Sequence, residues 1–458
     1  MHLARDLFVV PDDLPDRYVL YAPLLGIAAR VNRPLADRVA AFRELPAGEV
    51  PADAPGVSEL ARLGLVAERP FPRLEPDSRR RPFAPTSVTL FLTGACNLAC
   101  RYCHADSNAR PAQLDGVIAR AAFDLVLAHA TERGRTTVGL CLHGGGEPTV
   151  AWESLQGIVE YARRAAAARG VRARISVGTN GVLPEARARW LAGHADSATL
   201  SLDGCREAHD AARPTVAGGP TYDDVLRTAR CFDDAGLDYG IRMTVTASWV
   251  DRLPEAVGEL CGRVGGRSLK AEPVFPAGRA ERGAVGTPTA EAFIAAFREA
   301  RAVAVERGRR LSYSGARLGL TTDRFCHAPG TSFAVTPEGR VTSCYEATDP
   351  GDPRLDPFFW GRYESASGRF VLDEARRAEQ TRWTVHHQPG CADCFCKWTC
   401  AGDCPAKRVH SGEPRDPARS ARCAVNRALT RDQLLRALQQ GRTLRPLTAA
   451  ESEEIACT

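Results

Sequence analysis

The stretch Cys96-Asn97-Leu98-Ala99-Cys100-Arg101-Tyr102-Cys103 places three thiols within eight residues. It follows Val88–Leu92, an apolar run that predicts a β-strand. A loop this short brings three sulfur atoms close together, as a metal ion or an iron–sulfur cluster requires. Zinc knuckles bring a second Cys or His pair within about 12–20 residues, and none follows here. With no fourth cysteine nearby, one iron of a four-iron cluster would keep an open position for a substrate or cofactor.

Composition and charge set broad limits on the protein. A chain of 458 residues predicts two or three domains, and a net charge of +5 is too small to indicate nucleic-acid binding. No run of about 18 apolar residues predicts a membrane span, and the N-terminus lacks a signal-peptide pattern. Sixteen cysteines in such a chain indicate a reducing cytoplasm, where clustered cysteines bind metals more often than they form disulfides.

Strand and helix patterns alternate between residues 86 and 310. Six runs predict strands: Val88–Leu92, Thr137–His143, Arg174–Gly178, Ala198–Leu202, Tyr239–Thr246 and Ser268–Phe275. Amphipathic helices are predicted between and after them, for example at Phe123–Thr131, Leu155–Ala167 and Phe293–Glu306. Six βα units predict an α/β fold with a parallel sheet curled into a partial barrel. In such barrels the chemistry lies at the carboxyl ends of the strands.

Polar or glycine-rich motifs follow three of these strands. They are His143-Gly144-Gly145-Gly146-Glu147-Pro148, Gly178-Thr179-Asn180-Gly181 and Ser201-Leu202-Asp203-Gly204. Because glycine lacks a Cβ atom, the first motif lets the backbone approach a ligand closely. Each motif alone is also typical of a turn or a helix cap. Four residues after the third motif receive no assigned role: His209, Asp210, Arg213 and Pro214. We expect Glu272-Pro273 to line the floor of the barrel, whereas the pattern leaves the direction of Arg242 open.

A second cysteine region follows the pattern Cx12Gx4C, a gap, then Cx2Cx5Cx3Cx18C. Its members are Cys326, Gly339, Cys344, Cys391, Cys394, Cys400, Cys404 and Cys423. Phe333–Thr336 and Arg340–Ser343 flank Pro337-Glu338-Gly339 as the strands of a hairpin would. A pair of structural zinc sites is the alternative. Cys396 is an extra thiol in a crowded loop, and the remaining thiols are expected to be packing or surface residues: Cys141, Cys205, Cys231, Cys261 and Cys457.

Together these motifs resemble the radical S-adenosylmethionine (SAM) superfamily with a complete SPASM extension. The resemblance implies that Cys96, Cys100 and Cys103 hold a SAM-cleaving 4Fe-4S cluster. It implies SAM contacts from Gly145, Gly146, Glu147, Pro148, Thr179, Asn180, Ser201 and Asp203. It also implies two auxiliary 4Fe-4S clusters, three clusters in all. Cys391, Cys394, Cys400 and Cys423 would hold the outer one, and Cys326, Cys344 and Cys404 the inner one.

The resemblance also implies a reaction. One electron cleaves SAM to methionine and a 5′-deoxyadenosyl radical, which abstracts hydrogen from an unactivated carbon. SPASM enzymes act mostly on peptides, so the implied function is an oxidoreductase that installs a thioether or a carbon–carbon (cyclophane-type) crosslink in a ribosomally made peptide. The implied partners are a precursor peptide with a leader and a reductant such as flavodoxin or ferredoxin.

Two other functions stay open. A formylglycine-generating sulfatase maturase uses an Asp directly after the hairpin Cys as a base, but here Tyr345 and then Glu346 follow Cys344. A non-catalytic iron–sulfur electron carrier or zinc scaffold would need no SAM pocket, and the glycine motif argues against it.

The inner cluster lacks an obvious fourth ligand, because no further Cys lies just upstream of Cys326. Three thiolates would leave one iron open or bound to water, able to hold a substrate thiolate. Carboxylates are poor ligands beside soft thiolates. The alternatives that would close this iron are Asp323, Cys396 and Cys457.

Residues 1–80 are predicted to form a separate unit that resembles a winged-helix leader-recognition domain, and the alternative is an unrelated N-terminal cap. Tyr18–Val31 predicts two strands around a turn, Asn32 caps a helix, and Glu59–Val66 predicts a short helix closed by Gly64. A linker rich in Pro and Arg follows over residues 67–85. The remaining divisions are a radical SAM core (81–310), a SPASM domain (311–430) and a C-terminal helix, Arg427–Leu438, with its tail (431–458).

Overall fold

The six predicted strands form the parallel part of one eleven-stranded sheet in the computed structural model. The structure describes residues 1–72, 83–283, 285–326, 328–411, 420–442 and 444, so much of the predicted linker, the tail and Cys457 lie outside the described residues. The strands are β6 (Ser87–Leu90), β7 (Thr137–Leu142), β8 (Arg172–Thr179), β9 (Ser197–Ser201), β10 (Tyr239–Val245) and β11 (Ser268–Pro273). They pair in chain order, which confirms the predicted α/β fold with a parallel-rich sheet.

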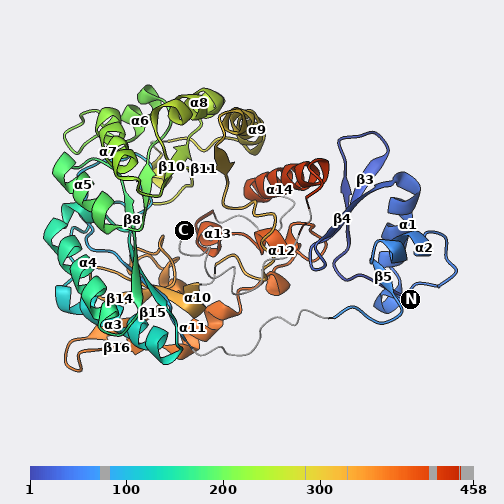
Figure 1. The fold of residues 1–458 in the computed structure, drawn as a ribbon, viewed down its shortest axis with the longest axis horizontal. Helices are drawn as coiled ribbons and strands as arrows, with labels where there is room; N and C mark the ends of the chain where they lie inside the picture. The colour runs from blue at the N-terminus through green and yellow to red at the C-terminus, as the bar shows by residue number, and fades with distance from the viewer. Residues whose placement is uncertain (73–82, 284, 327, 412–419, 443, 445–458) are drawn as a thin grey trace.

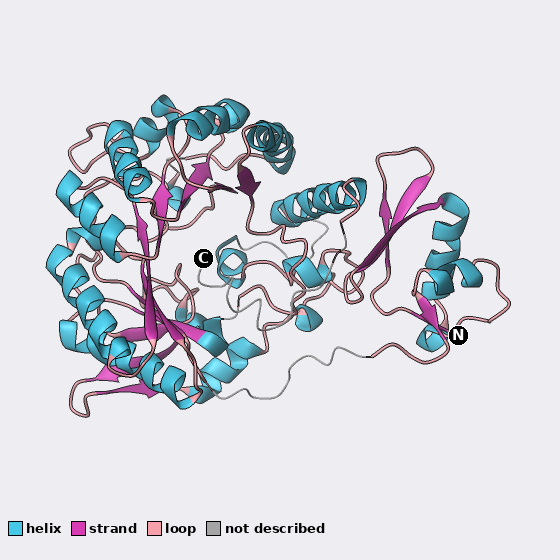
Figure 2. Cartoon of the chain, in the orientation of Figure 1, coloured by secondary structure: helices cyan, strands magenta, loops and turns pink. Residues whose placement is uncertain are grey.

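Seven helices follow the strands and lie in an arc along one side of the sheet (Figure 1). They are α3 (Gly116–Glu132), α4 (Trp152–Ala167), α5 (Glu185–His194), α6 (Arg206–Ala212), α7 (Tyr222–Ala235), α8 (Leu253–Arg263) and α9 (Ala290–Glu306). Buried and half-buried side chains alternate along the strands, which explains why the helices cover only one face of the sheet. In β10, Ile241 and Met243 are buried in the main apolar core, whereas Arg242 and Thr244 between them are only half-buried. On the side of the strands opposite the arc, Figure 2 shows loops and helices of the C-terminal region.

The C-terminal region extends the same sheet. The predicted hairpin is present as β13 (Ser332–Val335) and β14 (Arg340–Thr342), and β13 pairs in parallel with β6. Strands β15 (Phe359–Glu364) and β16 (Arg369–Leu372) follow at this edge, and β12 (Arg310–Ser312) forms the opposite edge. The helices of this region are α10 (Ala328–Thr331), α11 (Glu374–Thr381), α12 (Lys397–Cys400), α13 (Pro405–Ser411) and α14 (Ala421–Gln439). The last of these begins before the predicted start because Ser420 caps it, accepting from the Cys423 amide.

The N-terminal unit contains the predicted strand-turn-strand-helix sequence. Strands β3 (Arg17–Ala22) and β4 (Ile27–Asn32) are antiparallel, and Asn32 caps α1 (Arg33–Arg43) by accepting from the Leu35 amide at 3.1 Å. The predicted short helix is present as α2 (Val57–Arg62), which begins and ends earlier than expected. Three strands of this unit were not predicted: β1 (His2–Leu3), β2 (Phe8–Pro11) and β5 (Val66–Ala67). Short 3-10 helices lie at Pro46–Gly48, Pro148–Val150, Val250–Arg252, Ala280–Arg282, Asp356–Phe358 and Val385–His387. No helix among the described residues combines the length and apolar content that crossing a bilayer needs.

The N-terminal unit packs against the second cysteine region, beside α12 and α14 (Figure 1). Asp6 accepts hydrogen bonds from Lys397 Nζ at 2.9 Å and from Trp398 Nε1 at 2.8 Å. Apolar residues of β2 and β3 pack with Leu434 and Leu435 of α14. The unit is therefore fixed to the segment that carries the cysteines of the predicted outer cluster.

Candidate active site

The loop after β6 holds Cys96, Cys100 and Cys103 in partly buried positions. Cys96 is fixed at its backbone: its amide donates to Asn108 Oδ1 at 2.7 Å, and Asn108 Nδ2 donates back to its carbonyl at 3.0 Å. Cys103 Sγ lies 3.1 Å from Ser107 Oγ. Burial, reinforced by the nearby Glu147 carboxylate, raises the pKa of Cys96 to about 12. The free Cys96 thiol therefore stays protonated at neutral pH, and iron must displace this proton to bind.

The glycine motif after β7 packs directly against this loop. The Gly146 amide donates to the Thr93 carbonyl at 2.8 Å, and the Glu147 amide donates to the Ala95 carbonyl at 2.9 Å. A Cβ atom on Gly146 would lie 1.9 Å from the Ala95 oxygen, so no other residue fits there. Ser107 Oγ also donates to the Gly145 carbonyl at 3.0 Å. Glycine is thus required for contact with the protein backbone, and its predicted contact with SAM stays a prediction.

Glu147 connects the glycine motif to the end of β8 and to Cys96. Its buried Oε1 accepts from Thr179 Oγ1 at 2.7 Å and from Thr149, and its Oε2 accepts from the Asn180 amide at 2.7 Å. Burial raises the pKa of Glu147 despite these hydrogen bonds. Asn180 Nδ2 lies 3.7 Å from Cys96 Sγ. Three residues predicted to contact SAM therefore lie together beside one predicted cluster ligand.

The buried carboxylate of Asp203 accepts hydrogen bonds from several protein groups. Its side chain is 0% exposed and accepts from Arg213 Nε at 2.8 Å, Arg213 Nη2 at 3.1 Å, the Thr244 amide at 2.8 Å and the Tyr102 hydroxyl. Burial alone raises the pKa of Asp203, but the Arg213 guanidinium outweighs it and holds that pKa below its usual value. Asp203 thereby fixes Tyr102 beside Cys103. Its predicted contact with SAM stays a prediction, as does that of Ser201, which is half-buried at the end of β9.

Arg213 is a site residue whose role could not be assigned from the sequence. It is 6% exposed, and its guanidinium also lies over the Tyr102 ring at 5.1 Å from the centroid. His209 supports the same strand end, because its Nδ1 accepts from the Asp203 amide at 3.2 Å. The sequence contains the pattern His209-Asp210 followed by Arg213-Pro214, but it does not indicate that Arg213 pairs with Asp203.

Several cysteines of the second region lie close enough to act on one another electrostatically. Burial and the charges of Glu346, Cys404 and Cys326 raise the pKa of Cys344, which places these three thiols near one another. Cys344 follows β14 and Cys404 precedes α13. Their role as ligands of the inner cluster remains a prediction.

The cysteines predicted for the outer cluster also lie close enough to affect one another's pKa. Burial and then the charges of Cys394 and Cys423 raise the pKa of Cys391 to about 11. Burial and the charges of Asp403, Cys423 and Cys394 also raise the pKa of Cys400. The extra thiol Cys396 lies with this outer group, because a hydrogen bond from it lowers the pKa of Cys394 to about 7. Asp323, another proposed ligand of the inner cluster, pairs with Arg324 at 3.0 Å.

The first cysteine loop faces the inner cysteine group at the same end of the sheet. The His143 ring, directly after β7, stacks on the Tyr345 ring with 5.8 Å between centroids. His104, next to Cys103, interacts with Glu346 and with the Tyr345 backbone. Over the described ranges, no three His, Cys, Asp or Glu side chains take the arrangement of a single metal ion's ligands. In a 4Fe-4S cluster each thiolate binds its own iron, and a set of three thiols fits such a cluster with one open iron.

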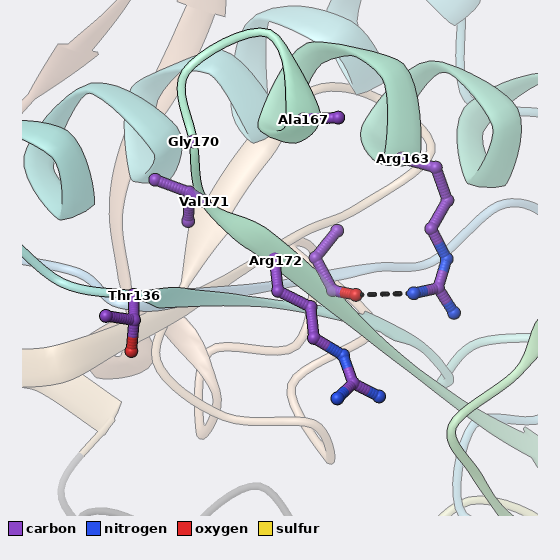
Figure 3. A pocket seen from close by; sticks show the side chains of 7 residues that line it. Thr136, Arg163, Ala167, Gly170, Val171 and Arg172 are labelled. Carbon is purple, nitrogen blue, oxygen red and sulfur yellow. Dashed lines mark hydrogen bonds between the residues drawn. The ribbon is translucent and has the colours of Figure 1, made fainter.

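A hollow elsewhere on the surface lies at the amino ends of β7 and β8, far along the strands from the cysteines (Figure 3). It is lined by Thr136, Arg163 and Arg172, among others. Both arginines pair with Asp196, at 2.9 and 2.7 Å. Since its charges are already satisfied, we assign this hollow no part in the site.

Known proteins share both the sequence and the fold. A model of the radical SAM superfamily matches residues 90–251. Mycofactocin maturase MftC of Mycolicibacterium smegmatis is 31% identical over 371 residues, 77% of this chain and 86% of that protein. The sporulation killing factor maturation protein SkfB of Bacillus subtilis is 26% identical over 57% of this chain and 60% of its own. The cysteine-type anaerobic sulfatase-maturating enzyme of Clostridium perfringens is 27% identical over 34% of this chain and 43% of its own. The solved structure of native anSMEcpe with bound AdoMet (SAM) matches with a TM-score of 0.60 and 18% identity, over 78% of this chain and 100% of that one.

Proposed function

Because this chain belongs to the radical SAM superfamily, we propose that it is a peptide maturase that modifies a ribosomally made precursor peptide. One observation carries the proposal: the cysteine loop with its Glu147 network faces a second set of cysteines at the same end of the sheet. When bound there, SAM and a 4Fe-4S cluster supply hydrogen abstraction from an unactivated carbon. The protein's task is to hold the target carbon in place and exclude water.

The chain's own residues divide this task. Cys96, Cys100 and Cys103 would hold the cluster. Glu147, with Thr179 and Asn180 beside it, presents buried oxygen and nitrogen atoms next to Cys96, which suits the amino and carboxylate groups of SAM. The glycine motif fixes the distance between these groups and the cysteine loop, since two of its amides bond to that loop's first residues. Gly145, Gly146, Pro148, Ser201 and Asp203 complete the proposed SAM contacts.

We further propose two auxiliary 4Fe-4S clusters, with Cys391, Cys394, Cys400 and Cys423 on the outer one and Cys326, Cys344 and Cys404 on the inner one. The grouping of these thiols by mutual charge effects supports this division. Three thiolates leave the inner cluster one open iron, and the position of Cys396 with the outer group favours that view. Auxiliary clusters suit an oxidative crosslink, either a thioether or a carbon–carbon bond, with flavodoxin or ferredoxin as reductant.

Peptide maturation is preferred to sulfatase maturation on the extent of similarity. The mycofactocin maturase aligns over 77% of the chain, whereas the sulfatase-maturating enzyme aligns over 34%. Tyr345 also stands where that second activity would need an Asp, and its ring is stacked on His143.

The domain division is part of the same proposal. We take residues 1–80 as a leader-recognition unit, 81–310 as the radical SAM core, 311–430 as the SPASM domain and 431–458 as a C-terminal helix and tail. The three-stranded antiparallel sheet of the first unit supports this, because an extended leader can add to a sheet edge as a further strand.

The test replaces Cys96, Cys100 and Cys103 by Ala in the full chain and measures 5′-deoxyadenosine formation from SAM under anaerobic, reducing conditions. We expect the product to disappear while iron falls from about twelve to about eight atoms per chain, because the other cysteine groups remain. Cys261→Ala, on α8 outside all three groups, is the control and should retain both. Retained SAM cleavage in the triple variant, or zinc in place of iron at residues 391–423, would contradict the proposal.

A further inference from the structure

Charged residues line the inner face of the sheet, on the side away from the helices. Arg242 on β10 pairs in register with Ser201 of β9 and with Lys270 of β11. The neighbours Ile241 and Met243 are buried at 1% and 0% against the helices, so Arg242 points to the opposite, inner face. Thr244 and Glu272 form the next pair along the same two strands.

Two more charged residues reach this face, Glu346 and Lys407. We call the set of five the interior charge cluster: Arg242, Lys270, Glu272, Glu346 and Lys407. Lys407 of α13 lies 3.7 Å from Glu272. Glu346 lies near Lys407, His104 and Arg242, which together hold its pKa below the usual value although burial opposes this. The cluster therefore lies between the loop of Cys103 and the loop of Cys344, where the target carbon of the substrate has to be held.

Lysine is rare in this chain, and its placement is selective. It supplies three of the 60 basic residues, at positions 270, 397 and 407. Two of the three belong to the interior charge cluster, and the third forms the ion pair with Asp6. A compact ammonium group differs from a planar guanidinium in shape and hydration, so these two positions present a different kind of cation from Arg242 beside them.

Two cations of the cluster lack a partner. Glu272 is satisfied by the Ser314 amide at 2.8 Å, by Ser314 Oγ at 2.9 Å and by Lys407. Arg242 and Lys270, by contrast, make no hydrogen bond or ion pair with any residue that the structure describes. Burial and the nearby Arg242 charge lower the pKa of Lys270, although Glu272 opposes them.

The charges around the cluster do not cancel. Burial lowers the pKa of His143 to about 4, so His143 is neutral, and Arg422 is already paired with Asp403 at 2.7 and 2.8 Å. Three cations then face two carboxylates, Glu272 and Glu346. The Oε2 atom of Glu346 is buried and has no hydrogen-bond partner among the described residues.

We propose that Arg242 and Lys270 bind a carboxylate of the substrate peptide, either its terminal carboxylate or the side chain of an Asp or Glu. The proposal rests on the peptide maturase function and names the group that the enzyme recognises. Half-buried cations without partners are costly, and an entering carboxylate removes that cost. Side chains on adjacent strands about 4.8 Å apart can both reach one carboxylate. Glu346, on the other side of the cluster, repels an anion and so directs it toward Arg242 and Lys270.

The test measures binding of three defined probes to the cluster-loaded protein by isothermal titration calorimetry. They are an N-acetylated alanine pentapeptide with a free carboxyl terminus, the same peptide as its carboxamide, and the carboxamide with one central Glu. We expect at least one carboxylate probe to bind about tenfold more tightly than the neutral carboxamide. Preference for the first or third probe identifies the terminal or side-chain carboxylate, respectively.

The variant Arg242→Gln/Lys270→Gln should reduce this preference to about twofold or less, with iron content as a check of folding. The control is Arg310→Gln, which removes an exposed cation on β12 near Lys270 and should keep the preference. Equal or undetectable binding of all three probes by the unaltered protein, or a preference that survives in the double variant, would overturn the proposal. SAM cleavage by the unaltered protein is measured separately, so failure of the maturase function is distinguished from failure of carboxylate binding.

Discussion

Replacing Arg213 by Met should destabilise the site, because Arg213 is the only positively charged hydrogen-bond partner of Asp203 among the described residues. Two charge-assisted bonds, at 2.8 and 3.1 Å, are lost, and a carboxylate with 0% exposure is left uncompensated. Removing one partner of a buried ion pair costs about 3–5 kcal/mol. For 458 residues unfolding as one unit, that loss lowers the thermal midpoint by roughly 3–5 °C. Tyr102, which also bonds to Asp203, should lose its fixed position beside Cys103.

The assay is anaerobic thermal unfolding followed by circular dichroism, with iron content measured on the same samples. The matched control is Arg206→Met, because Arg206 makes the same bidentate contact with Asp223, at 2.6 Å for each bond, on the protein surface. Exposed pairs contribute little, so the control should unfold near the unaltered midpoint. If Arg213→Met and Arg206→Met unfold at the same temperature, the argument from the buried pair is wrong.

Three further substitutions test other contacts. Gly146→Ala brings a Cβ to 1.9 Å from the Ala95 carbonyl oxygen and should abolish iron binding by the first cysteine loop, measured as iron per chain. The control Gly157→Ala in α4, where a Cβ would have nothing within 4 Å, should keep that iron. Glu147→Gln removes the buried charge beside the cysteine loop and should weaken SAM binding at least about tenfold by calorimetry, and unchanged affinity would exclude a direct contact. Asp6→Asn breaks the ion pair with Lys397 and should speed amide hydrogen exchange in β2 and β3 but not in β8.

Much of the framework could be predicted because its signals are local. Alternation and apolar runs placed all six core strands, Pro337-Glu338-Gly339 placed the hairpin, and Asn32 placed the start of α1. The proximity of Cys96, Cys100 and Cys103 followed from their spacing, because one short loop keeps these thiols together.

The rest depended on contacts between distant residues. Asp6 and Lys397 are 391 positions apart, and no local pattern pairs them. Arg213 was visible in sequence, yet its role depends on the fold bringing Asp203 and Tyr102 to it. The direction of Arg242 was also open in the sequence, and it follows from the structure, in which Ile241 and Met243 on either side are buried against the helices.

The parallel pairing of β13 with β6 makes the C-terminal region part of the sheet that carries the first cysteine loop. Because β14 is antiparallel to β13, the chain leaves β14 at the end of the sheet opposite the first cysteine loop and must turn back for Tyr345 to stack on His143. A chain divided at residue 310 would separate β13 from β6 and expose the β6 edge, whose unpaired backbone groups invite pairing with other chains. We therefore expect the two parts to aggregate when they are produced separately.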